Sequence, residues 1–423
     1  MDMFVIQGGT RLRGDIEING AKNAALPIMA AALLTTDEIV IRRVPDLADV
    51  RHLIRLMEKL GARIRRNEDS TLHIKVEDES NNLADYESVR RMRDSICVLG
   101  PLLARRGQAE VSMPGGCAIG DRPINLHLRG MEALGASMHL DGGNIIAESP
   151  HLRGKQIFLG GPFGSTVLGT ANIMTAACLA QGHTVIEAAA CEPEIVDLGN
   201  FLNRMGAHVS GHGSPHIVIE GVDELHGADY EIIPDRIEAG TFMVAAAITN
   251  GELILKNCRT DHLLAVVDRL NLIGVEVEVL DGDVRVSTTR RLNPADVTTQ
   301  PYPGFPTDLQ AQLMTLLCLA DGNSIITEKI FPDRFMHTAE LNRMGAKLRK
   351  EGPTVVVQGV RELTGAPVMA SDLRASAALV LAGMVARGQT EVHRVYHIDR
   401  GYEQIEEKLN RVGARIERVE EPA

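Results

Sequence analysis

The chain has 423 residues, 44% of them hydrophobic and 24% charged, which is typical of a soluble globular protein and too apolar for a disordered one. Its length allows two or three domains, each with its own hydrophobic core. Acidic residues outnumber basic ones by 56 to 44, tryptophan is absent and only 3% of residues are aromatic, so we expect no nucleic-acid partner. An anionic ligand must be bound by local clusters of Arg and Lys, against a net charge of −12.

The cysteines and the apolar segments indicate the compartment. The six cysteines lie far apart, without a CxxC pair or a Cys/His group at metal-ligand spacing, which is typical of a reducing compartment. The opening residues turn polar too early for a signal peptide. Residues 156–186 carry no charged side chain, but glycines interrupt this segment and disfavour a membrane span. These features predict a cytoplasmic protein without a bound metal.

In chain order, the first expected elements are a strand over residues 3–9, an apolar helix from about residue 22 and a strand within residues 33–43. An amphipathic helix follows, closes at a glycine and leads into another apolar strand. This helix end recurs six times, at Gly61, Gly135, Gly206, Gly274, Gly345 and Gly413. The spacing of 68 to 74 residues is close to one sixth of the chain, so the sequence predicts six split β-α-β repeats.

The first helix of each repeat is apolar on nearly all faces, so we expect it to be buried with sheets outside it. Three repeats around a pseudo-threefold axis satisfy this requirement. The predicted fold is a two-domain inside-out α/β barrel with three repeats in each domain. We expect one domain over residues 22–229 and a second over residues 1–21 plus 230–423, because the opening strand belongs with the last domain. The active site is expected in the cleft between these domains.

The segments before the six apolar helices are the expected chemical centres. They cover residues 19–25, 90–96, 161–170, 234–241, 305–312 and 370–377. A helix N-terminus attracts anions, and phosphate is the first ligand we expect. Helix capping by Asn, Asp, Ser or Thr is the alternative interpretation for each segment, and it applies to a single acid such as Asp308 or Asp372.

Four of these segments also hold a cation, namely Lys22, Arg93, Arg236 and Arg374. A cation beside the positive end of a helix is unfavourable unless an anion joins it. The cations therefore favour a bound anion, and a protein carboxylate is the alternative partner. Arg334 and the pair Asp399–Arg400 lie in turns before amphipathic helices, where they either bind an anion or form solvated ion pairs.

Residues 113–123 form a glycine-rich loop around Cys117, with Arg122 close by. An exposed thiol near guanidinium groups would have a lowered pKa and could act as a nucleophile or an acid. The alternative is that a single loop cysteine is incidental. Cys97, Cys178 and Cys318 lie in apolar helices and are expected in the core.

Seven segments resemble one known family: INGAKNAALP, PGGCAIGDRPINLH, EPEIVDLGNFL, PDRIEAGTF, FPTDLQAQ, DLRASAALVLAG and YHIDRGYEQIEEKL. They run from residue 18 to the C-terminus and are similar to the UDP-N-acetylglucosamine enolpyruvyl transferases of bacterial cell-wall peptidoglycan synthesis, a process that supports cell shape and division. The resemblance implies transfer of the enolpyruvyl group of phosphoenolpyruvate to the 3'-hydroxyl of UDP-N-acetylglucosamine, with release of phosphate. It implies no cofactor and no metal, two small-molecule substrates and a monomer.

By the same resemblance, Asp308 accepts the proton of the sugar hydroxyl and Cys117 acts as an acid at the phosphoenolpyruvate methylene. Lys22, Arg122 and Arg400 hold the phosphate. The catalytic residues implied are Lys22, Cys117, Asp308 and Arg400. The substrate-binding residues implied are Asn23, Arg93, Arg122, Pro123, Ile124, Asn125, Leu126, Thr166, Val167, Asp235, Arg334, Asp372 and Arg374.

The chain departs from the family at one segment. Where the family has a short SVGAT-like sequence at the nucleotide, this chain has GGPFGSTVLGT, and backbone N–H groups around Gly164 and Ser165 are expected to replace that contact. Two alternative functions stay open at this point. One is the sister reaction on shikimate 3-phosphate, and the other is a catalytically silent regulator that binds a sugar nucleotide.

Overall fold

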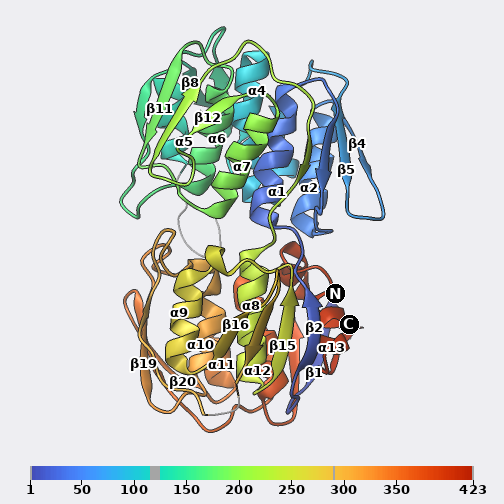
Figure 1. Cartoon of the computed structure of the whole chain (residues 1–423), viewed down its shortest axis with the longest axis vertical. Helices are drawn as coiled ribbons and strands as arrows, with labels where there is room; N and C mark the ends of the chain where they lie inside the picture. Colours follow the sequence, from blue (N-terminus) through green and yellow to red (C-terminus); the bar gives the residue numbers. More distant parts are fainter. Residues whose placement is uncertain (1, 115–123, 289–290, 422–423) are drawn as a thin grey trace. The chain divides into compact units, whose positions relative to one another are not determined.

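The computed structural model describes residues 2–114, 124–288 and 291–421. Cys117, Arg122 and Pro123 lie outside these residues. The chain divides into two compact units, with crossings between Asn19 and Gly20 and between Ile233 and Pro234 (Figure 1). We call the described part of residues 20–233 the N-unit and the described residues on either side of it the C-unit.

The N-unit holds twelve strands in the described ranges: β3 (Ile39–Arg42), β4 (Ala62–Arg66), β5 (Leu72–Val76), β6 (Leu83–Ala84), β7 (Gln108–Ser112), β8 (Ser137–Asp141), β9 (Asn144–Glu148), β10 (Gln156–Phe158), β11 (His183–Glu187), β12 (His208–Ser210), β13 (His216–Glu220) and β14 (Asp229–Glu231). Its helices are α1 (Lys22–Ala31), η1 (Ala32–Leu34), α2 (Ala48–Lys59), α3 (Tyr86–Val89), η2 (Arg93–Val98), α4 (Leu99–Arg106), α5 (Asn125–Ala133), α6 (Val167–Ala177) and α7 (Pro193–Arg204). The sheets have the strand orders β14-β3-β5-β4, β6-β7-β9-β8 and β10-β11-β13-β12.

The C-unit has the same plan. Its strands are β1 (Asp2–Gln7), β2 (Arg13–Glu17), β15 (Glu252–Lys256), β16 (Glu276–Val279), β17 (Val284–Ser287), β18 (Val297–Thr298), β19 (Asn323–Thr327), β20 (Lys347–Glu351), β21 (Thr354–Gln358), β22 (Pro367–Met369), β23 (Gln389–His393) and β24 (Ile416–Glu420). Its helices are α8 (Arg236–Ile248), η3 (Thr260–His262), α9 (Leu264–Ile273), η4 (Thr307–Leu309), α10 (Gln310–Leu317), α11 (His337–Arg343), α12 (Leu373–Val385), η5 (Val395–Arg400) and α13 (Ile405–Arg411). The strand orders are β22-β23-β1-β24, β16-β17-β15-β2 and β18-β19-β21-β20.

All six sheets share one pairing pattern. One edge pair is parallel, as in β10 with β11, where Gln156 faces Val185, and the other two pairs are antiparallel. The expected repeat ended with a single strand after the glycine, and this was incomplete. In five sheets a hairpin adds a fourth strand, and in the sheet of β6 to β9 the turn between β8 and β9 uses Gly142 and Gly143 at positive φ. In the sixth sheet β1, from the start of the chain, takes the place of the second hairpin strand. The second strand of each hairpin lies inside its sheet, as β9 lies between β7 and β8.

In each unit, the segment of chain that leads into a crossing supplies the edge strand of one sheet. β2 precedes the N-unit in the chain but pairs in parallel with β15, and β14 precedes the return crossing but pairs with β3. At the crossings, the Ala21 N–H donates to the Ile233 carbonyl and the Asp235 N–H donates to the Asn19 carbonyl, both at 2.8 Å. Each hydrogen bond joins two segments of the same unit, directly before α1 in the N-unit and directly before α8 in the C-unit.

The apolar helices are buried, as the sequence predicts. All 13 residues of α8 and all eight of α10 are buried, and nine of the ten residues of α1 are buried. Figure 1 shows these helices in the middle of each unit with the strands outside them. The six outer helices α2, α5, α7, α9, α11 and α13 each lead into the predicted glycine, with φ between 91° and 109°. This left-handed geometry is available to glycine without a steric penalty.

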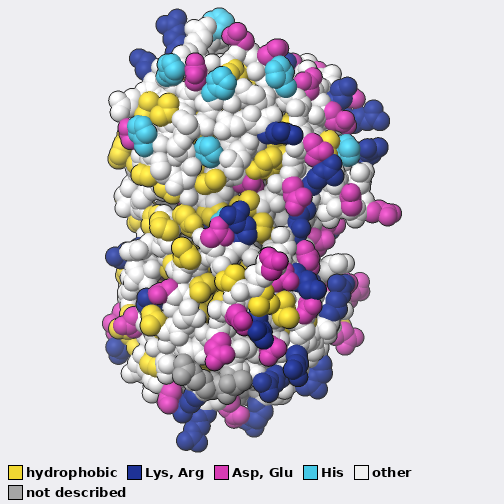
Figure 2. Space-filling view, in the orientation of Figure 1, with side chains coloured by type: hydrophobic (Ala, Val, Ile, Leu, Met, Phe, Trp, Pro, Cys, Tyr) yellow, Lys and Arg dark blue, Asp and Glu magenta, His cyan; other side chains and the backbone are white. Residues whose placement is uncertain are grey.

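The structure confirms the predicted inside-out α/β fold with two units of repeated sheets and buried helices. The buried positions of Cys97, Cys178 and Cys318 are also confirmed. Within the described ranges, none of the helices has the length and apolar character that crossing a bilayer requires. On the face shown in Figure 2, acidic and basic side chains are interspersed.

Candidate functional site

Asp308 lies in η4, directly before the buried helix α10, and binds two arginines of the C-unit. Its Oδ1 accepts a hydrogen bond from Arg334 Nη1 at 2.7 Å, and its Oδ2 lies 3.5 Å from Arg374 Nη2. The residue at the N-cap position of η4 is Pro306, and no side chain caps this turn. The capping interpretation is therefore wrong for Asp308, whose carboxylate instead forms charge-assisted contacts.

Arg374 is almost fully buried, with 2% of its surface exposed, in the first turn of α12. Its guanidinium lies 5.2 Å from the centre of the Tyr402 ring. Burial alone would lower its pKa, but Tyr402 and Asp308 outweigh burial and raise it. Nε and Nη1 have no hydrogen-bond partner among the residues that the structure describes. Unsatisfied buried N–H groups are costly, and an anionic ligand would supply the acceptors.

Arg334 is also buried, so the expectation of a solvated ion pair is wrong for this residue. Burial opposes its charge, but the carboxylates of Asp308 and Asp372 raise its pKa. Its Nη1 also donates to Thr307 Oγ1 at 3.1 Å, and its carbonyl accepts from Gln310 Nε2 at 3.2 Å. The guanidinium is thereby fixed on the carboxylate of Asp308.

A buried polar network joins the starts of the central helices of the C-unit. Gln312 Nε2 of α10 lies 3.1 Å from Thr241 Oγ1 of α8, 3.2 Å from Tyr402 Oη and 3.0 Å from the Asp308 carbonyl. The Thr241 and Tyr402 hydroxyl groups are 2.8 Å apart. A buried network of this kind rigidifies its surroundings, so the backbone at Asp308 is well positioned.

The other acids at helix starts in this unit act as caps. Asp372 accepts hydrogen bonds from the N–H groups of Arg374 and Ala375, and Asp235 accepts from those of Ile237 and Glu238. The capping interpretation thus holds for Asp372. Arg236, the first residue of α8, lies 5.6 Å from the centre of the Tyr302 ring.

In the turn before α13, Asp399 forms an ion pair with Arg418, at 2.6 Å between Oδ1 and Nη2. Arg400 is the last residue of η5 and is half-buried. The structure brings Asp308, Arg334 and Arg374 together as neighbours in the C-unit. It holds Asp235 and Asp372 at helix caps and gives Asp399 a partner on β24.

In the N-unit, Lys22 opens α1 and is 4% exposed. Its Nζ lies 2.7 Å from Asp49 Oδ2 and 3.7 Å from Asp94 Oδ2. The alternative partner, a protein carboxylate, is therefore present at Lys22. Asn23 follows in α1 and Arg93 opens η2, and both are half-buried.

The segment at the start of α5 lies beside the glycine-rich turn before α6. Ile124 is buried and Asn125 is exposed, while Leu126 lies so near Gly161 that a Cβ there would be 3.1 Å from Leu126 Cδ1. The turn closes through the Gly164 N–H, which donates to the Gly161 carbonyl at 3.1 Å. The Gly164 N–H is thus used within the turn, and the expectation that backbone N–H groups around Gly164 and Ser165 contact a nucleotide stays a prediction for Ser165.

The remaining predicted residues of this segment lie at the start of α6. Thr166 caps α6 through a hydrogen bond from the Gly169 N–H, at 3.2 Å, and Val167 is the first residue of the helix. Both side chains are half-buried. The capping interpretation therefore holds for Thr166.

Burial raises the pKa of all five cysteines that the structure describes. For Cys178, Cys258 and Cys318 the pKa rises to about 12. These thiols are therefore protonated and unreactive at neutral pH. Within the described ranges, no three His, Cys, Asp or Glu side chains are grouped as a metal site would require.

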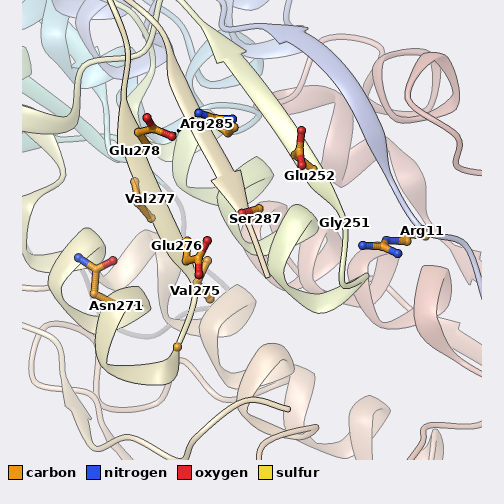
Figure 3. Close-up of a pocket in the computed structure, with 11 residues that line it drawn as sticks. Arg11, Gly251, Glu252, Asn271, Val275, Glu276, Val277, Glu278, Arg285 and Ser287 are labelled. Atoms are coloured by element: carbon orange, nitrogen blue, oxygen red, sulfur yellow. Dashed lines mark hydrogen bonds and ion pairs between the residues drawn. The ribbon is translucent and has the colours of Figure 1, made fainter. Parts of the chain in front are cut away.

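A groove of about 700 Å³ lies on the sheet that contains β15, β16 and β17. Figure 3 shows the residues that line it. Its lining includes Arg11, Glu252 and Glu276, together with the ion pair of Glu278 with Arg285. None of the described residues expected at the site lines this groove, and we assign it no part in the chemistry.

Sequence reasoning missed the residues that support the arginines. These are Thr307, Glu328, Gln312, Tyr402 and His337. Thr307, Gln312 and Tyr402 lie within segments singled out from the sequence, so proximity to Asp308 and Arg400 was the available signal. For Glu328 and His337 the sequence carries no pattern that separates them from ordinary polar residues.

His337 opens α11 and is 1% exposed. Burial lowers the pKa of its imidazole to about 4, while the Asp372 carboxylate raises it and the Arg334 guanidinium lowers it. His337 is therefore neutral at pH 7 and does not compete with the arginines as a cation. A neutral imidazole beside the buried guanidinium of Arg334 avoids further repulsion.

Since the folded pKa of His337 lies below its ordinary value of 6.5, the unfolded chain takes up the proton first as the pH falls. Neutral His337 makes its full contribution to the free energy of unfolding above about pH 6.5, and this contribution is lost progressively from about pH 6.5 to 4. Between pH 7.5 and 5, we expect the wild type to lose about 2 kcal/mol more stability than a His337→Gln variant. Chemical unfolding at both pH values measures the difference, and equal losses in the two proteins would contradict the assignment.

The comparisons with known proteins agree with this architecture. Residues 6–409 match the family model of EPSP synthase (3-phosphoshikimate 1-carboxyvinyltransferase). Proteins named UDP-N-acetylglucosamine 1-carboxyvinyltransferase from Methylacidiphilum infernorum and Akkermansia muciniphila are 54% and 50% identical to this chain over 419 and 425 residues. Each match covers 99% of this chain and 99% of the relative.

Among solved structures, the enolpyruvyl transferase NikO from Streptomyces tendae matches with a TM-score of 0.91 at 25% identity, covering 100% of this chain and 99% of its own. An EPSP synthase from Acinetobacter baumannii matches with a TM-score of 0.76 at 19% identity, covering 99% of this chain and 100% of its own, which shows a shared fold. Half or more of the residues are identical to the Methylacidiphilum infernorum and Akkermansia muciniphila proteins over nearly the full length. This chain therefore belongs to the UDP-N-acetylglucosamine 1-carboxyvinyltransferases, enzymes of the EPSP synthase family.

Proposed function

We propose that this enzyme transfers the enolpyruvyl group of phosphoenolpyruvate to the 3'-hydroxyl of UDP-N-acetylglucosamine and releases phosphate. The observation that carries the proposal is Asp308, a carboxylate held at a helix start by two buried arginines, one of which has unused N–H groups. Such a group can accept a proton beside a binding place for an anion. The names of the relatives support the choice of substrates.

In the proposed reaction, Asp308 takes the proton of the sugar 3'-hydroxyl while the oxygen of that hydroxyl bonds to C2 of phosphoenolpyruvate. Cys117 donates a proton to C3, which gives a tetrahedral intermediate that carries both the sugar oxygen and the phosphate. Loss of a C3 proton then restores the double bond as the C2–O bond to phosphate breaks. Lys22, Arg122 and Arg400 neutralise the phosphate, which lowers the barrier to addition and to release.

We further propose that the two units act on one pair of substrates. Lys22, Asn23 and Arg93 belong to the N-unit, and Asp308, Arg334 and Arg374 belong to the C-unit. Ile124, Asn125, Leu126, Thr166 and Val167 are proposed to contact the sugar nucleotide from the N-unit. The enzyme is proposed to work in the cytoplasm as a monomer, in the supply of cell-wall precursors.

The alternatives receive less support. A shikimate 3-phosphate enzyme shares this fold, but two EPSP synthase structures from Acinetobacter baumannii are only 19% and 18% identical to this chain. Proteins named UDP-N-acetylglucosamine 1-carboxyvinyltransferase are 54% and 50% identical to it. A silent regulator would not require a carboxylate supported by two buried arginines. Measuring phosphate release from phosphoenolpyruvate distinguishes the proposed transferase from the shikimate 3-phosphate enzyme and from the silent regulator. We expect release with UDP-N-acetylglucosamine and none with shikimate 3-phosphate, and the reverse pattern or no release at all would contradict the proposal.

Replacing Asp308 by Asn removes the proton acceptor and keeps the size of the side chain. We expect turnover to fall by about two to four powers of ten, with a smaller change in substrate affinity. Steady-state kinetics measure both quantities. Asp321→Asn is a matched control, because Asp321 pairs with Arg291 on the exposed surface at 3.2 Å. Near-normal turnover of folded Asp308→Asn protein would remove Asp308 from the mechanism.

Cys117 lies outside the described residues, but the raised pKa values of the other five thiols make a clear prediction. At neutral pH, iodoacetamide should label Cys117 selectively, because the other thiols are protonated. By family resemblance, the epoxide fosfomycin should label the same residue, faster with UDP-N-acetylglucosamine present. Peptide mapping by mass spectrometry locates the label. Labelling of Cys191, the half-buried cysteine, in preference to Cys117 would refute the prediction.

A further inference from the structure

Glu328, just after β19, is a fully buried carboxylate whose two oxygens accept four hydrogen bonds. Oε1 accepts from Thr299 Oγ1 at 2.6 Å and from the N–H groups of Ile330 and Phe331 at 2.8 and 3.0 Å. Oε2 accepts from Thr307 Oγ1 at 2.9 Å. Glu328 thus joins the turn before α11 to the residue that precedes Asp308.

The hydroxyl of Thr307 links this carboxylate to the arginine of the site. A hydroxyl has one proton, and when Thr307 donates it to Glu328 its lone pairs are left to accept. Arg334 Nη1 donates to that oxygen at 3.1 Å and to Asp308 Oδ1 at 2.7 Å. Glu328 therefore fixes the direction of the Thr307 proton, and Thr307 and Asp308 together hold one N–H₂ group of Arg334.

We propose that Glu328 and Thr307 are positioning residues that keep Arg334 on the carboxylate of Asp308 during the reaction. The inference rests on the proposed role of Asp308 as proton acceptor. Neither residue touches the reacting atoms in this account. They act through Arg334. Without the Thr307 hydroxyl, Arg334 Nη1 would keep Asp308 Oδ1 as an acceptor and lose Thr307 Oγ1, so its guanidinium would gain freedom to rotate.

Loss of this positioning has two expected signatures. Turnover falls, because a small displacement of a catalytic group is costly, while the Michaelis constant for UDP-N-acetylglucosamine changes less. The acidic limb of the pH profile moves to higher pH, because a looser cation favours the ionised carboxylate less. Asp308 faces Arg334 and Arg374 in this structure. Asp372 raises the pKa of Arg334 and Arg374 lowers it, and Arg334 in turn lowers the pKa of His337.

A purely structural role for Glu328 is the competing explanation, and Thr299 provides a matched control. The Thr299 hydroxyl also donates to Glu328 and also accepts one N–H group, but this donor is the backbone of Lys329, at 2.9 Å. Thr299→Val and Thr307→Val therefore each remove one hydroxyl donor from the same carboxylate. Only the second also removes an acceptor from Arg334.

The experiment compares full-length Thr307→Val, Thr307→Ser and Thr299→Val by steady-state kinetics from pH 5 to 9, with thermal unfolding to monitor folding. For Thr307→Val we expect turnover to fall about 10- to 100-fold and the acidic limb to move up by about half a pH unit. Thr307→Ser should restore most of the activity, because it keeps the hydroxyl. Thr299→Val should lower the unfolding temperature and leave turnover within about twofold.

Equal turnover of Thr307→Val and Thr299→Val, or a Thr307→Ser variant as poor as Thr307→Val, would overturn the inference. An unchanged acidic limb in a slow Thr307→Val variant would also overturn it. Asp308→Asn is measured beside them to separate the two claims. If Asp308→Asn is inactive and Thr307→Val is normal, only the positioning role fails. If Asp308→Asn is fully active, the proposed function of Asp308 fails first.

Discussion

The architecture follows from helices that have no polar face. A helix such as α8, with all 13 residues buried, is stable only when other elements cover every side of it. A single repeat supplies one small sheet and one outer helix, which cannot enclose such a helix alone. Three repeats per unit let the central helices cover one another while the sheets close the outside. The same packing places the polar starts of these helices together, where they become available for chemistry.

Charge at those helix starts is the second constraint. Burying a guanidinium is costly unless hydrogen bonds and an opposite charge compensate, and Arg334 and Arg374 share the single carboxylate of Asp308. His337 stays neutral beside Arg334, and Glu328 accepts a hydrogen bond from Thr307, which in turn accepts one from Arg334. Lys22 in the N-unit is compensated separately, by Asp49 and Asp94. The cations can thus be held ready for an anionic substrate in a protein whose net charge is −12.

Some of this could be predicted from the sequence, because it depends on local patterns. The glycine that ends each outer helix needs positive φ, and an apolar helix must be buried, so the repeats and the inside-out fold are both readable. Asp308 and Asp372 were not separable, since each lies beside an apolar helix. Asp372 directly precedes α12 and caps it, whereas Asp308 lies inside the 3-10 turn η4 and forms ion pairs with Arg334 and Arg374. The partners Asp49 and Glu328 depend on tertiary contacts 20 or more residues away, which no local pattern records.

The central claim is that this fold performs addition and elimination on phosphoenolpyruvate with the sugar hydroxyl as the attacking group. Proton NMR of the reaction in deuterium oxide, with phosphoenolpyruvate and UDP-N-acetylglucosamine, tests it most directly. The account predicts an enol ether at the 3' position of the sugar with deuterium in its vinyl group, because C3 gains a solvent-derived proton before it loses one. A 3'-enol ether without deuterium would contradict the addition step, and unchanged substrates with active, folded enzyme would contradict the function itself.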